Sequence, residues 1–405
     1  MPIPRPGLAF LFPGVGSQYP GMAAKWARRY SIFRETLNEA SDELGVDLFG
    51  LCADPEAGDR LNRQVESQLA LLAMGVGLYR VFREEIGVPA THLAGHSLGE
   101  YTALCCAGAM SLADALRLVR LRGEAVSRIA EELDGGMMWV LDLDADRVER
   151  ICRHWIEDGS AVYPAIVDGP RQVAISAPGA DLKRAAAEFE ARGARVFPLR
   201  VSGPFHTPLM RGAAEELKEA LAGVTIAKTA VPVLSGVNAL PHPGGTAGAA
   251  LLTDQLVSPV RWDKVQSRLI ADGVGAAVEL GPGRVLSFIA ARNGGRLRVR
   301  PVDDHADFDA VGAALRLGPD DAPQVLDSCL RVAVSAPARR HGPDVVRHFR
   351  RLADWRHASP GVRPAGAEGA LACLDVLNEL LVAKGLDGAE RRSSIAAAAG
   401  GRVWA

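Results

Sequence analysis

Residues 95–100, Gly-His-Ser-Leu-Gly-Glu, constrain this chain more than any other segment. They follow the short apolar run Thr91–Gly95 and lead into a helix-like segment that begins near Leu98. This order fits a G-x-S-x-G nucleophile elbow, in which a serine lies on a sharp strand-to-helix turn. The two glycines allow the crowded backbone of such a turn to form. Ser97 is therefore a candidate nucleophile, although serine and glycine also build ordinary turns.

The composition of the 405-residue chain is that of an ordinary globular protein. Hydrophobic residues make up 48% and charged residues 23%, and the formal net charge is -2, so no global charge bias favours nucleic acid or an anionic membrane. No segment approaches the roughly 18 apolar residues of a membrane-spanning helix. The six cysteines form no C-x-x-C pair and no metal-like spacing, which favours buried thiols in a reducing compartment. We therefore expect a cytoplasmic protein.

Strands and helices alternate through two separate parts of the chain. Short apolar strands are expected at Leu8–Phe12, Thr91–Gly95, Val231–Ser235 and Ala276–Leu280. Segments with helical periodicity, such as Leu69–Glu85 and Leu112–Ile129, lie between them. Because elements of these lengths alternate, we expect a mostly parallel sheet covered on both faces. This large α/β domain, similar to that of α/β-hydrolases, is predicted to comprise residues 1–134 and 202–318.

The pattern changes between residues 135 and 201. The successive segments are Met137–Asp142, Ala145–Trp155, Ala161–Val167, Gln172–Ala177, Asp181–Arg192 and Val196–Val201. Their order, β-α-β-β-α-β, is typical of a small ferredoxin-like subdomain. We expect this subdomain to be inserted into the larger fold.

A linker rich in proline, glycine and aspartate follows at residues 318–323. Beyond it we expect three helices, near residues 324–335, 344–358 and 368–384, separated by breaks that contain proline and glycine. Residues 319–405 are therefore predicted to form a C-terminal helical extension of unassigned role.

Among the nine histidines, His206 has the context best suited to a catalytic base. Pro204 and Pro208 flank it and restrict the backbone directly after a predicted strand. Such a loop can hold an imidazole at the carboxyl edge of a parallel sheet, where Ser97 is also expected. The alternative is a loop histidine that merely caps a neighbouring helix.

Attack by a serine on an acyl group also needs donors for the oxyanion that develops. The glycine-rich segment Phe12–Gln18 leaves the first strand and can turn a backbone N–H toward the elbow, and the N–H of Leu98 is the second candidate donor. The alternatives are a tight strand-to-helix turn and a phosphate loop. Against the phosphate loop, no Gly-Lys-Ser/Thr follows, and the glycine spacing fits neither a P-loop nor G-x-G-x-x-G.

Together these segments resemble the malonyl-CoA:acyl carrier protein transacylase family, which includes the acyltransferase domains of polyketide synthases. The resemblance covers roughly residues 7–317. Its seven blocks, in the family's order, are Phe12–Gln18, Glu66–Leu71, Gly95–Tyr101, Arg120–Gly123, Pro204–Met210, Gln255–Trp262 and Glu279–Val285. Agreement at all seven, with matching intervals, makes the resemblance specific.

The resemblance implies roles for five residues of a catalytic centre. Ser97 would be the nucleophile, and His206 the general base and later the general acid. The main-chain carbonyl of Gln255 would orient the histidine in place of a carboxylate. The main-chain N–H groups of Leu98 and Val15 would bind the oxyanion, although many members carry glutamine where this chain has Val15.

Three further residues are implied in substrate binding. Arg122 would hold the free carboxylate of a malonyl or methylmalonyl group through two parallel hydrogen bonds. Gln68 would add a polar contact in the same pocket. Phe205 would narrow the space beside the substrate α-carbon and favour malonyl, although excluding one methyl group contributes only about 1–3 kcal/mol. Taken alone, these residues would be a helix-surface cation, a surface glutamine and core packing.

The activity implied is ping-pong transfer of a malonyl group from malonyl-CoA, through an acyl-serine, to the phosphopantetheine thiol of an acyl carrier protein. It needs no metal and no redox cofactor, and the phosphopantetheine belongs to the carrier protein. We expect a monomer that serves a polyketide or fatty acid synthase in trans and binds neither nucleic acid nor a membrane.

The C-terminal extension carries a basic strip. Between Arg331 and Arg363 there are eight arginines and two aspartates, with three histidines interspersed. Because carrier proteins are typically acidic, this strip is a candidate for docking one by complementary charge. The simpler interpretation, which we favour, is the solvated face of an added helical hairpin.

Other functions stay open at this point. Lipases and esterases of the α/β-hydrolase class also carry such an elbow, but they usually place the histidine late, after an acid, and the loop at Val15 is not an HGGG-type oxyanion motif. An editing hydrolase of the same fold would release acyl groups from stalled carriers, and Arg122 argues against it. A non-catalytic carrier-binding subunit is the third alternative.

Overall fold

The computed structural model describes residues 7–199, 203–316, 322–358 and 366–386, together with Glu390, Ser394 and Ala398. The chain divides into two compact units, Met1–Glu85 with Pro89–Asp303 and Ile86–Val88 with Asp304–Ala405. The division falls at Asp303 rather than at residue 318. Helix α14 (His305–Arg316) groups with the C-terminal helices because its Ala313 packs against their apolar core. Most of the expected linker lies outside the described residues.

A parallel sheet forms the centre of the first unit. Its strands are β1 (Gly7–Phe12), β2 (His92–Gly95), β7 (Val233–Leu234), β8 (Val274–Leu280) and β9 (Arg298–Val302). They lie in the order β7-β2-β1-β8-β9, and every neighbouring pair is parallel. Residues Ala9–Phe12 of β1 are at most 1% exposed, so this strand runs through the core. The expectation of a mostly parallel sheet is confirmed.

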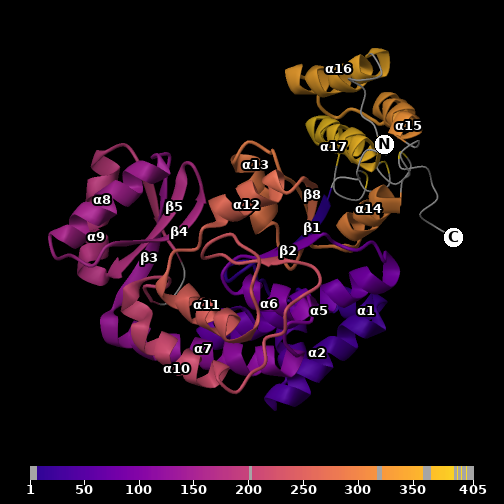
Figure 1. Ribbon diagram of the computed structural model, residues 1–405. Helices are drawn as coiled ribbons and strands as arrows, with labels where there is room; N and C mark the ends of the chain where they lie inside the picture. Colours follow the sequence, from indigo (N-terminus) through magenta and orange to yellow (C-terminus); the bar gives the residue numbers. More distant parts are fainter. Residues whose placement is uncertain are drawn as a thin grey trace. The chain divides into compact units, whose positions relative to one another are not determined.

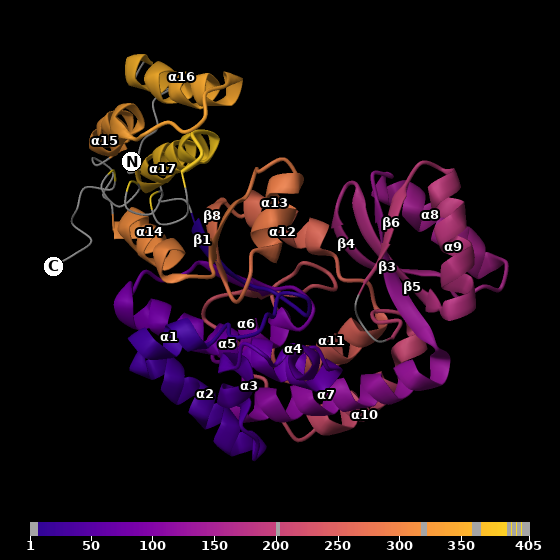
Figure 2. The same cartoon turned by 180° about the vertical axis from the view of Figure 1, so that it is seen from behind.

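Helices cover both faces of this sheet. They are α1 (Ala24–Arg29), α2 (Ser31–Leu44), α3 (Leu48–Ala53), α4 (Gly58–Leu61), α5 (Gln64–Glu85), α6 (Gly99–Cys106), α7 (Leu112–Leu133), α10 (Arg211–Leu221), α11 (Gly245–Val257), α12 (Trp262–Ala271), α13 (Val285–Arg292) and the 3-10 helix η1 (Pro208–Met210). Figure 1 shows α5 and α6 on one side of the sheet and α12 and α13 on the other, and the reverse view in Figure 2 shows the same arrangement.

Helix α5 lies in the interior of the first unit, where its residues Ser67–Leu78 are all buried. With 22 residues it is long and apolar enough, by length and composition, to cross a membrane. Its uninterrupted apolar run, Leu69–Tyr79, is shorter than the roughly 18 apolar residues of a membrane-spanning helix, so the expectation from the sequence, which concerned such a run, is not contradicted. Since 78% of its most apolar window is buried, the apolar surface of α5 is in contact with the rest of the protein.

An antiparallel sheet comes from the middle of the chain. It consists of β3 (Gly135–Leu141), β4 (Tyr163–Gly169), β5 (Gln172–Pro178) and β6 (Arg195–Pro198), with helices α8 (Ala145–Glu157) and α9 (Gly179–Ala191). The strand order is β4-β5-β3-β6, and all pairs are antiparallel. The helices contribute the fully buried Val148 and Phe189 to a core of their own with this sheet. Strand β4 also joins the rest of the unit, because the N–H of Val167 donates to the carbonyl of Val260 at 2.8 Å.

Helices also build the C-terminal unit. Besides α14 they are α15 (Ala322–Ser335), α16 (Pro343–His357) and α17 (Gly366–Ala383), within a few residues of the expected positions. They enclose a core in which Leu352 and Leu377 are fully buried. Lys384 is 7% exposed and donates from Nζ to the carbonyl oxygens of Ala333 (2.6 Å) and Ala336 (2.8 Å). This cation satisfies carbonyl groups that the end of α15 leaves without helical partners.

Candidate active site

Ser97 lies on a sharp turn between β2 and α6, at the carboxyl end of the parallel sheet. Its φ of 51° is in the left-handed region, which is uncommon for a residue other than glycine. A Cβ at Gly95 would lie 1.8 Å from the carbonyl carbon of Gly99, and a Cβ at Gly99 would lie 2.0 Å from the carbonyl oxygen of Phe12. No side chain fits at either position without displacing backbone. The turn therefore has the backbone of a nucleophile elbow.

The imidazole of His206 faces Ser97. Nε2 of His206 is 2.8 Å from Oγ of Ser97, and Nδ1 is 2.8 Å from the carbonyl oxygen of Gln255. Because a carbonyl oxygen only accepts, the ring proton lies on Nδ1 and the Nε2 lone pair is directed at the hydroxyl. His206 is 3% exposed and has a positive φ of 60°. The loop between Pro204 and Pro208 thus holds the ring against the serine.

Burial keeps this imidazole neutral. Desolvation, followed by the positive charge of Arg122, lowers the pKa of His206 to about 3, and the bond to the carbonyl of Gln255 opposes the shift. At neutral pH the ring is therefore an unprotonated acceptor, which is the state that a general base needs.

Glu100 is a buried carboxyl group behind the elbow that was not predicted from the sequence. It is fully buried, and its Oε2 accepts from Nε2 of Gln255 at 2.7 Å and from the N–H of Gly236 at 3.0 Å. The same amide of Gln255 donates to the carbonyl of Ser97 at 3.1 Å. Burial raises the pKa of Glu100. Gln255 therefore links α11 to the serine turn through its side chain, while its main chain orients His206.

Arg122 projects from α7 into the same site. It is 1% exposed, its Nη1 donates to Oε1 of Gln68, and its Nη2 lies 3.4 Å from Oγ of Ser97. The guanidinium carbon is 5.8 Å from the ring centroid of Tyr101, a favourable cation–π distance. Within the residues that the structure describes, Nε of Arg122 has no hydrogen-bond partner. The guanidinium therefore has a donor left for a carboxylate that lies beside the serine.

Gln68 fixes the orientation of this guanidinium. It is fully buried on α5, and its Nε2 donates to the carbonyl of Gln64 at 3.1 Å, which turns its Oε1 toward Arg122. Burial lowers the pKa of Arg122, and the neighbouring Tyr101 and Glu100 oppose the shift. An arginine remains charged at neutral pH even so. The site thus contains a buried cation whose direction is set by a neutral partner.

Two main-chain N–H groups near the elbow are available to an oxyanion. In the described parts of the chain, neither the N–H of Leu98 nor that of Val15 donates to another protein group. The loop that carries Val15 packs on the elbow, because the N–H of His96 donates to the carbonyl of Phe12 at 2.9 Å and a Cβ at Gly14 would lie 2.6 Å from the carbonyl oxygen of His96. Both donors therefore lie in segments that meet at the serine.

The loop after β8 supports the loop after β1. A Cβ at Gly281 would lie 2.4 Å from the ring of Pro13, and one at Gly283 would lie 3.2 Å from the carbonyl oxygen of Ser17. Gly283 also has a φ of 76°, which favours glycine on conformational grounds. These contacts explain why the block Glu279–Val285 accompanies the serine motif although it is far away in the sequence.

Phe205 directly precedes His206 in the sequence and is 6% exposed. The centroids of the Phe205 and His206 rings are 6.3 Å apart. The carbonyl of Phe205 accepts a hydrogen bond from Oγ of Ser176 at 2.9 Å, which ties this loop to the antiparallel sheet. An aromatic ring therefore lies next to the imidazole.

His96 forms a second link between the elbow and the antiparallel sheet. Its Nε2 is 2.9 Å from Oδ1 of Asp168 in β4, and that carboxylate also accepts from Nε2 of Gln172 at 2.9 Å. Asp168 is 1% exposed, and Nε2 of Gln266 donates to its carbonyl at 3.0 Å. The pairing was not predicted, because 72 positions separate the two residues in the sequence. The antiparallel sheet thus contacts the residue that directly precedes Ser97.

Comparison with known proteins assigns the family. The acyl transferase domain family matches residues 9–317, which is more than half of the chain. The malonyl CoA-acyl carrier protein transacylase of Haemophilus influenzae is 40% identical over 305 residues, which are 75% of this chain and 97% of that protein. The chain belongs to the malonyl-CoA:acyl carrier protein transacylase family. The resemblance expected from the seven sequence blocks is confirmed.

Solved structures of transacylase family members share the fold of this chain. The malonyl-CoA:acyl carrier protein transacylase of Xanthomonas oryzae is 40% identical with a TM-score of 0.72, and the match covers 76% of this chain and 98% of that one. A malonyl-transacylase solved in complex with a type II PKS acyl-carrier protein is 37% identical with a TM-score of 0.71, and the match covers 74% and 97%. Residues 318–405 lie beyond the family match.

The structure brings the residues expected in a transacylase site together. Ser97, His206 and the carbonyl of Gln255 form one hydrogen-bonded series, and Arg122 with Gln68 approaches the serine from α7 and α5. The roles of Glu100 and His96 were not predicted, although both residues belong to the elbow hexapeptide. Their closeness to Ser97 in the sequence could have indicated that they belong to the site.

Proposed function

We propose that this transacylase is an acyl carrier protein S-malonyltransferase. It moves a malonyl group from malonyl-CoA, through an acyl-serine, to the phosphopantetheine thiol of an acyl carrier protein. The observation that carries the proposal is the 3.4 Å distance between Nη2 of Arg122 and Oγ of Ser97. A carboxylate held by this guanidinium belongs to an acyl group whose other end lies at the nucleophile. Relatives named malonyl CoA-acyl carrier protein transacylase support the same substrate.

The first half-reaction acylates the serine. Oγ of Ser97 attacks the thioester carbonyl while its proton passes to Nε2 of His206 at 2.8 Å. The carbonyl of Gln255 stabilises the imidazolium through Nδ1. The N–H groups of Leu98 and Val15 bind the oxyanion of the tetrahedral intermediate. When that intermediate collapses, the C–S bond breaks and His206 returns the proton to the departing CoA thiol.

The second half-reaction reverses these roles. The phosphopantetheine thiol of the carrier gives its proton to Nε2 of His206 and attacks the malonyl ester on Ser97. The ester C–O bond then breaks, and the imidazolium protonates Oγ of Ser97. No step requires a metal ion or a redox cofactor, so we propose that the enzyme uses neither.

Arg122 and Phe205 account for the proposed choice of acyl group. Two charge-assisted hydrogen bonds from the guanidinium favour a dicarboxylic donor over acetyl. The aromatic ring of Phe205 beside the imidazole reduces the space for an α-methyl group, which favours malonyl over methylmalonyl by about 1–3 kcal/mol. The buried Arg122 also argues against an editing hydrolase, which has no need to recognise a carboxylate.

The proposal also covers the subdomain arrangement, the oligomeric state, the pathway and the location of the enzyme. We take the antiparallel sheet with α8 and α9 to be a ferredoxin-like subdomain inserted into an α/β-hydrolase-like large domain, and the β-α-β-β-α-β order supports this. We propose a monomer that acts in trans for a polyketide or fatty acid synthase. The six free cysteines support a location in the cytoplasm.

Intact-protein mass spectrometry after exposure to malonyl-, methylmalonyl- and acetyl-CoA tests this function. Wild type should gain one malonyl group and little acetyl, whereas Ser97→Ala should gain none. Arg122→Ala should lose the preference for malonyl over acetyl. A malonyl adduct that persists in Ser97→Ala, or equal acetyl and malonyl loading by wild type, contradicts the proposal. Stoichiometric release of free malonate with no carrier product would instead identify a hydrolase.

A further inference from the structure

Helix α16 uses only one of its faces to build the C-terminal unit. Val345, Phe349 and Leu352 of this helix pack into the apolar core of the unit. The opposite side bears a groove of about 660 Å³ lined by residues at helical spacing between Pro343 and Trp355. Among the lining residues Trp355 also packs against the core, whereas Val346, Arg347, Arg350 and Arg351 are exposed and are not part of it.

Three arginines dominate this groove, and their charge is only partly compensated. Arg347 pairs with Asp344 of its own helix at 3.0 Å, and Arg351 lies 3.8 Å from Glu379. Arg350 has no ion pair or side-chain hydrogen bond among the described residues, and Asp354 is the acidic residue of the lining. Exposed pairs of this kind are weak, so the arginines remain available to an acidic partner.

Apolar side chains accompany the arginines. Val346 is 55% exposed, and Trp355 lines the groove with the guanidinium of Arg351 5.0 Å from its ring centroid. Tryptophan and arginine are the residues most often responsible for affinity at protein interfaces, whereas an arginine-rich surface without apolar contacts gives mainly electrostatic attraction. The composition therefore suits a protein partner with an acidic helix.

We propose that this α16 face, made of Val346, Arg347, Arg350, Arg351 and Trp355, recruits the acyl carrier protein by binding an acidic helical surface of the carrier. The inference rests on the proposed transfer of malonyl to that protein. A transferase that acts in trans must meet its carrier at every turnover, and complementary charge raises the rate of such encounters. The face lies outside the family match, so it is an addition of this chain to the shared catalytic fold.

A second copy of the chain is the rival occupant, because helices α2 and α7 bear an acidic groove of about 630 Å³. Two of the four acids that line that groove already have cationic partners within their own unit. Glu39 lies 2.6 Å from Arg80, and Glu43 lies 3.5 Å from Arg117. We choose the carrier protein as the occupant because the proposed reaction requires this encounter at every turnover, whereas nothing in the proposed reaction requires a second copy.

Separate assays of the two half-reactions test the proposal. The test variant carries Arg347→Glu, Arg350→Glu and Arg351→Glu together. Acylation of Ser97 by malonyl-CoA, followed by intact mass, should be unchanged, as should transfer to free pantetheine. The KM for the holo carrier protein that wild type loads best should rise by about 10-fold or more. Raising the ionic strength should increase the wild-type KM toward that of the variant.

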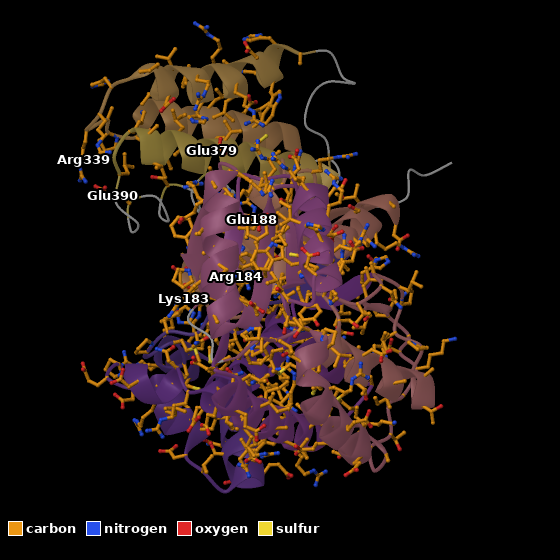
Figure 3. The ribbon with its side chains drawn as sticks, turned by 90° about the vertical axis from the view of Figure 1, so that its left-hand side faces the viewer. Lys183, Arg184, Glu188, Arg339, Glu379 and Glu390 are labelled. Atoms are coloured by element: carbon orange, nitrogen blue, oxygen red, sulfur yellow. The ribbon has the colours of Figure 1, made fainter. Side chains whose placement is uncertain are left out.

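Two control variants distinguish a loss of carrier binding at the α16 face from a general effect of reversed charge and from unfolding. Lys183 is an exposed cation on α9 of the other unit (Figure 3). Reversing its charge with Lys183→Glu should leave the KM for the carrier protein unchanged. Arg350→Glu alone should give a smaller increase, and it serves as the test if the triple variant does not fold.

Each outcome has a defined meaning. An unchanged carrier KM in the folded triple variant overturns the proposal, and so does an equal rise in Lys183→Glu. If light scattering shows that wild type is a dimer and the triple variant a monomer, the occupant is a second copy and the carrier proposal is wrong. Failure of wild type to acylate Ser97 would instead overturn the proposed function itself.

Discussion

The two units of this protein differ in where the charged groups with a proposed role lie, since those of the first unit are buried and those of the C-terminal unit are exposed. The catalytic unit buries Arg122, Glu100 and His206, each held by a specific partner. The C-terminal unit fills its core with apolar residues such as Leu377 and carries its arginines outside on α16. A buried charge is costly unless it has a partner, and the buried Lys384 of the C-terminal unit accordingly donates to the carbonyls of Ala333 and Ala336. A surface charge has little effect on stability and remains available for recognition.

The largest effect that we expect is the loss of kcat/KM for malonyl-CoA in Arg122→Ala, which removes a buried charge. Under the proposed function, removing the guanidinium takes away two charge-assisted bonds to the substrate carboxylate, of about 1.5–3 kcal/mol each. The kcat/KM for malonyl-CoA should therefore fall by roughly 10²- to 10⁴-fold, while that for acetyl-CoA should not fall. Arg122→Lys keeps the charge but loses the planar fork, and should recover only part of the activity. Equal losses for both acyl donors would show that Arg122 is merely structural.

Leu377→Ala tests the apolar interior of the other unit. Leu377 is fully buried on α17, and truncating a buried leucine typically costs about 2–5 kcal/mol. Urea unfolding followed by circular dichroism should show destabilised C-terminal helices. Acylation of Ser97 by malonyl-CoA should keep its rate under native conditions, because the residues of the site belong to the first unit. A loss of acylation that matches the loss of stability would mean that the two units do not fold independently.

Acidification should weaken the catalytic unit through its buried histidines. Burial lowers the pKa of His206 to about 3 and that of His242 to about 4. The unfolded chain therefore binds more protons below pH 6.5, and stability is lost as the pH falls from 6.5 toward these values. At pH 5 the loss should be about 2 kcal/mol for each histidine.

His242→Leu isolates one of these contributions. In the described residues neither ring nitrogen of His242 has a hydrogen-bond partner, so the substitution removes no such bond. The variant should lose less stability than wild type between pH 7.5 and pH 5, as measured by urea unfolding. An identical pH dependence in the two proteins would contradict the assignment.

The smallest effect is expected from Arg350→Glu on the stability of the folded protein. Its side chain is exposed and pairs with no described residue, so the free energy of unfolding should change by less than about 0.5 kcal/mol. Its effect on the carrier KM is predicted to be much larger than this. Thermal unfolding of the variant measures the first quantity, and a clear loss of stability would show that the α16 face supports the fold.

Much of the catalytic centre was predictable because its residues lie in short local motifs. The elbow around Ser97 combines a strand, two glycines and a helix within a few positions. Arg122 and Gln68 were assigned to the site only through the family resemblance, since an isolated arginine or glutamine on a helix is normally a surface residue. Glu100 was missed for the same reason: its burial depends on Gly236 and Gln255, which are far away in sequence.

Two features of the fold were also not predicted from the sequence. Strand β9 was not predicted, because the alternation of arginine and valine in residues 298–302 resembles an exposed segment. Its position at the edge of the sheet explains that composition, since an edge strand has one neighbour and a partly solvated surface. The boundary at Asp303 was also missed, because the apolar face of α14 does not reveal which unit it packs against.

The close contacts of Gly95 and Gly99 restrict how this site can vary among relatives. A methyl group at either glycine would overlap a backbone atom, whereas the side chain of Ser97 is half-buried and faces Nε2 of His206. Cysteine could replace the serine without moving the main chain, but alanine could not replace either glycine alone. A search for distant members should therefore require the two glycines and allow the nucleophile to change.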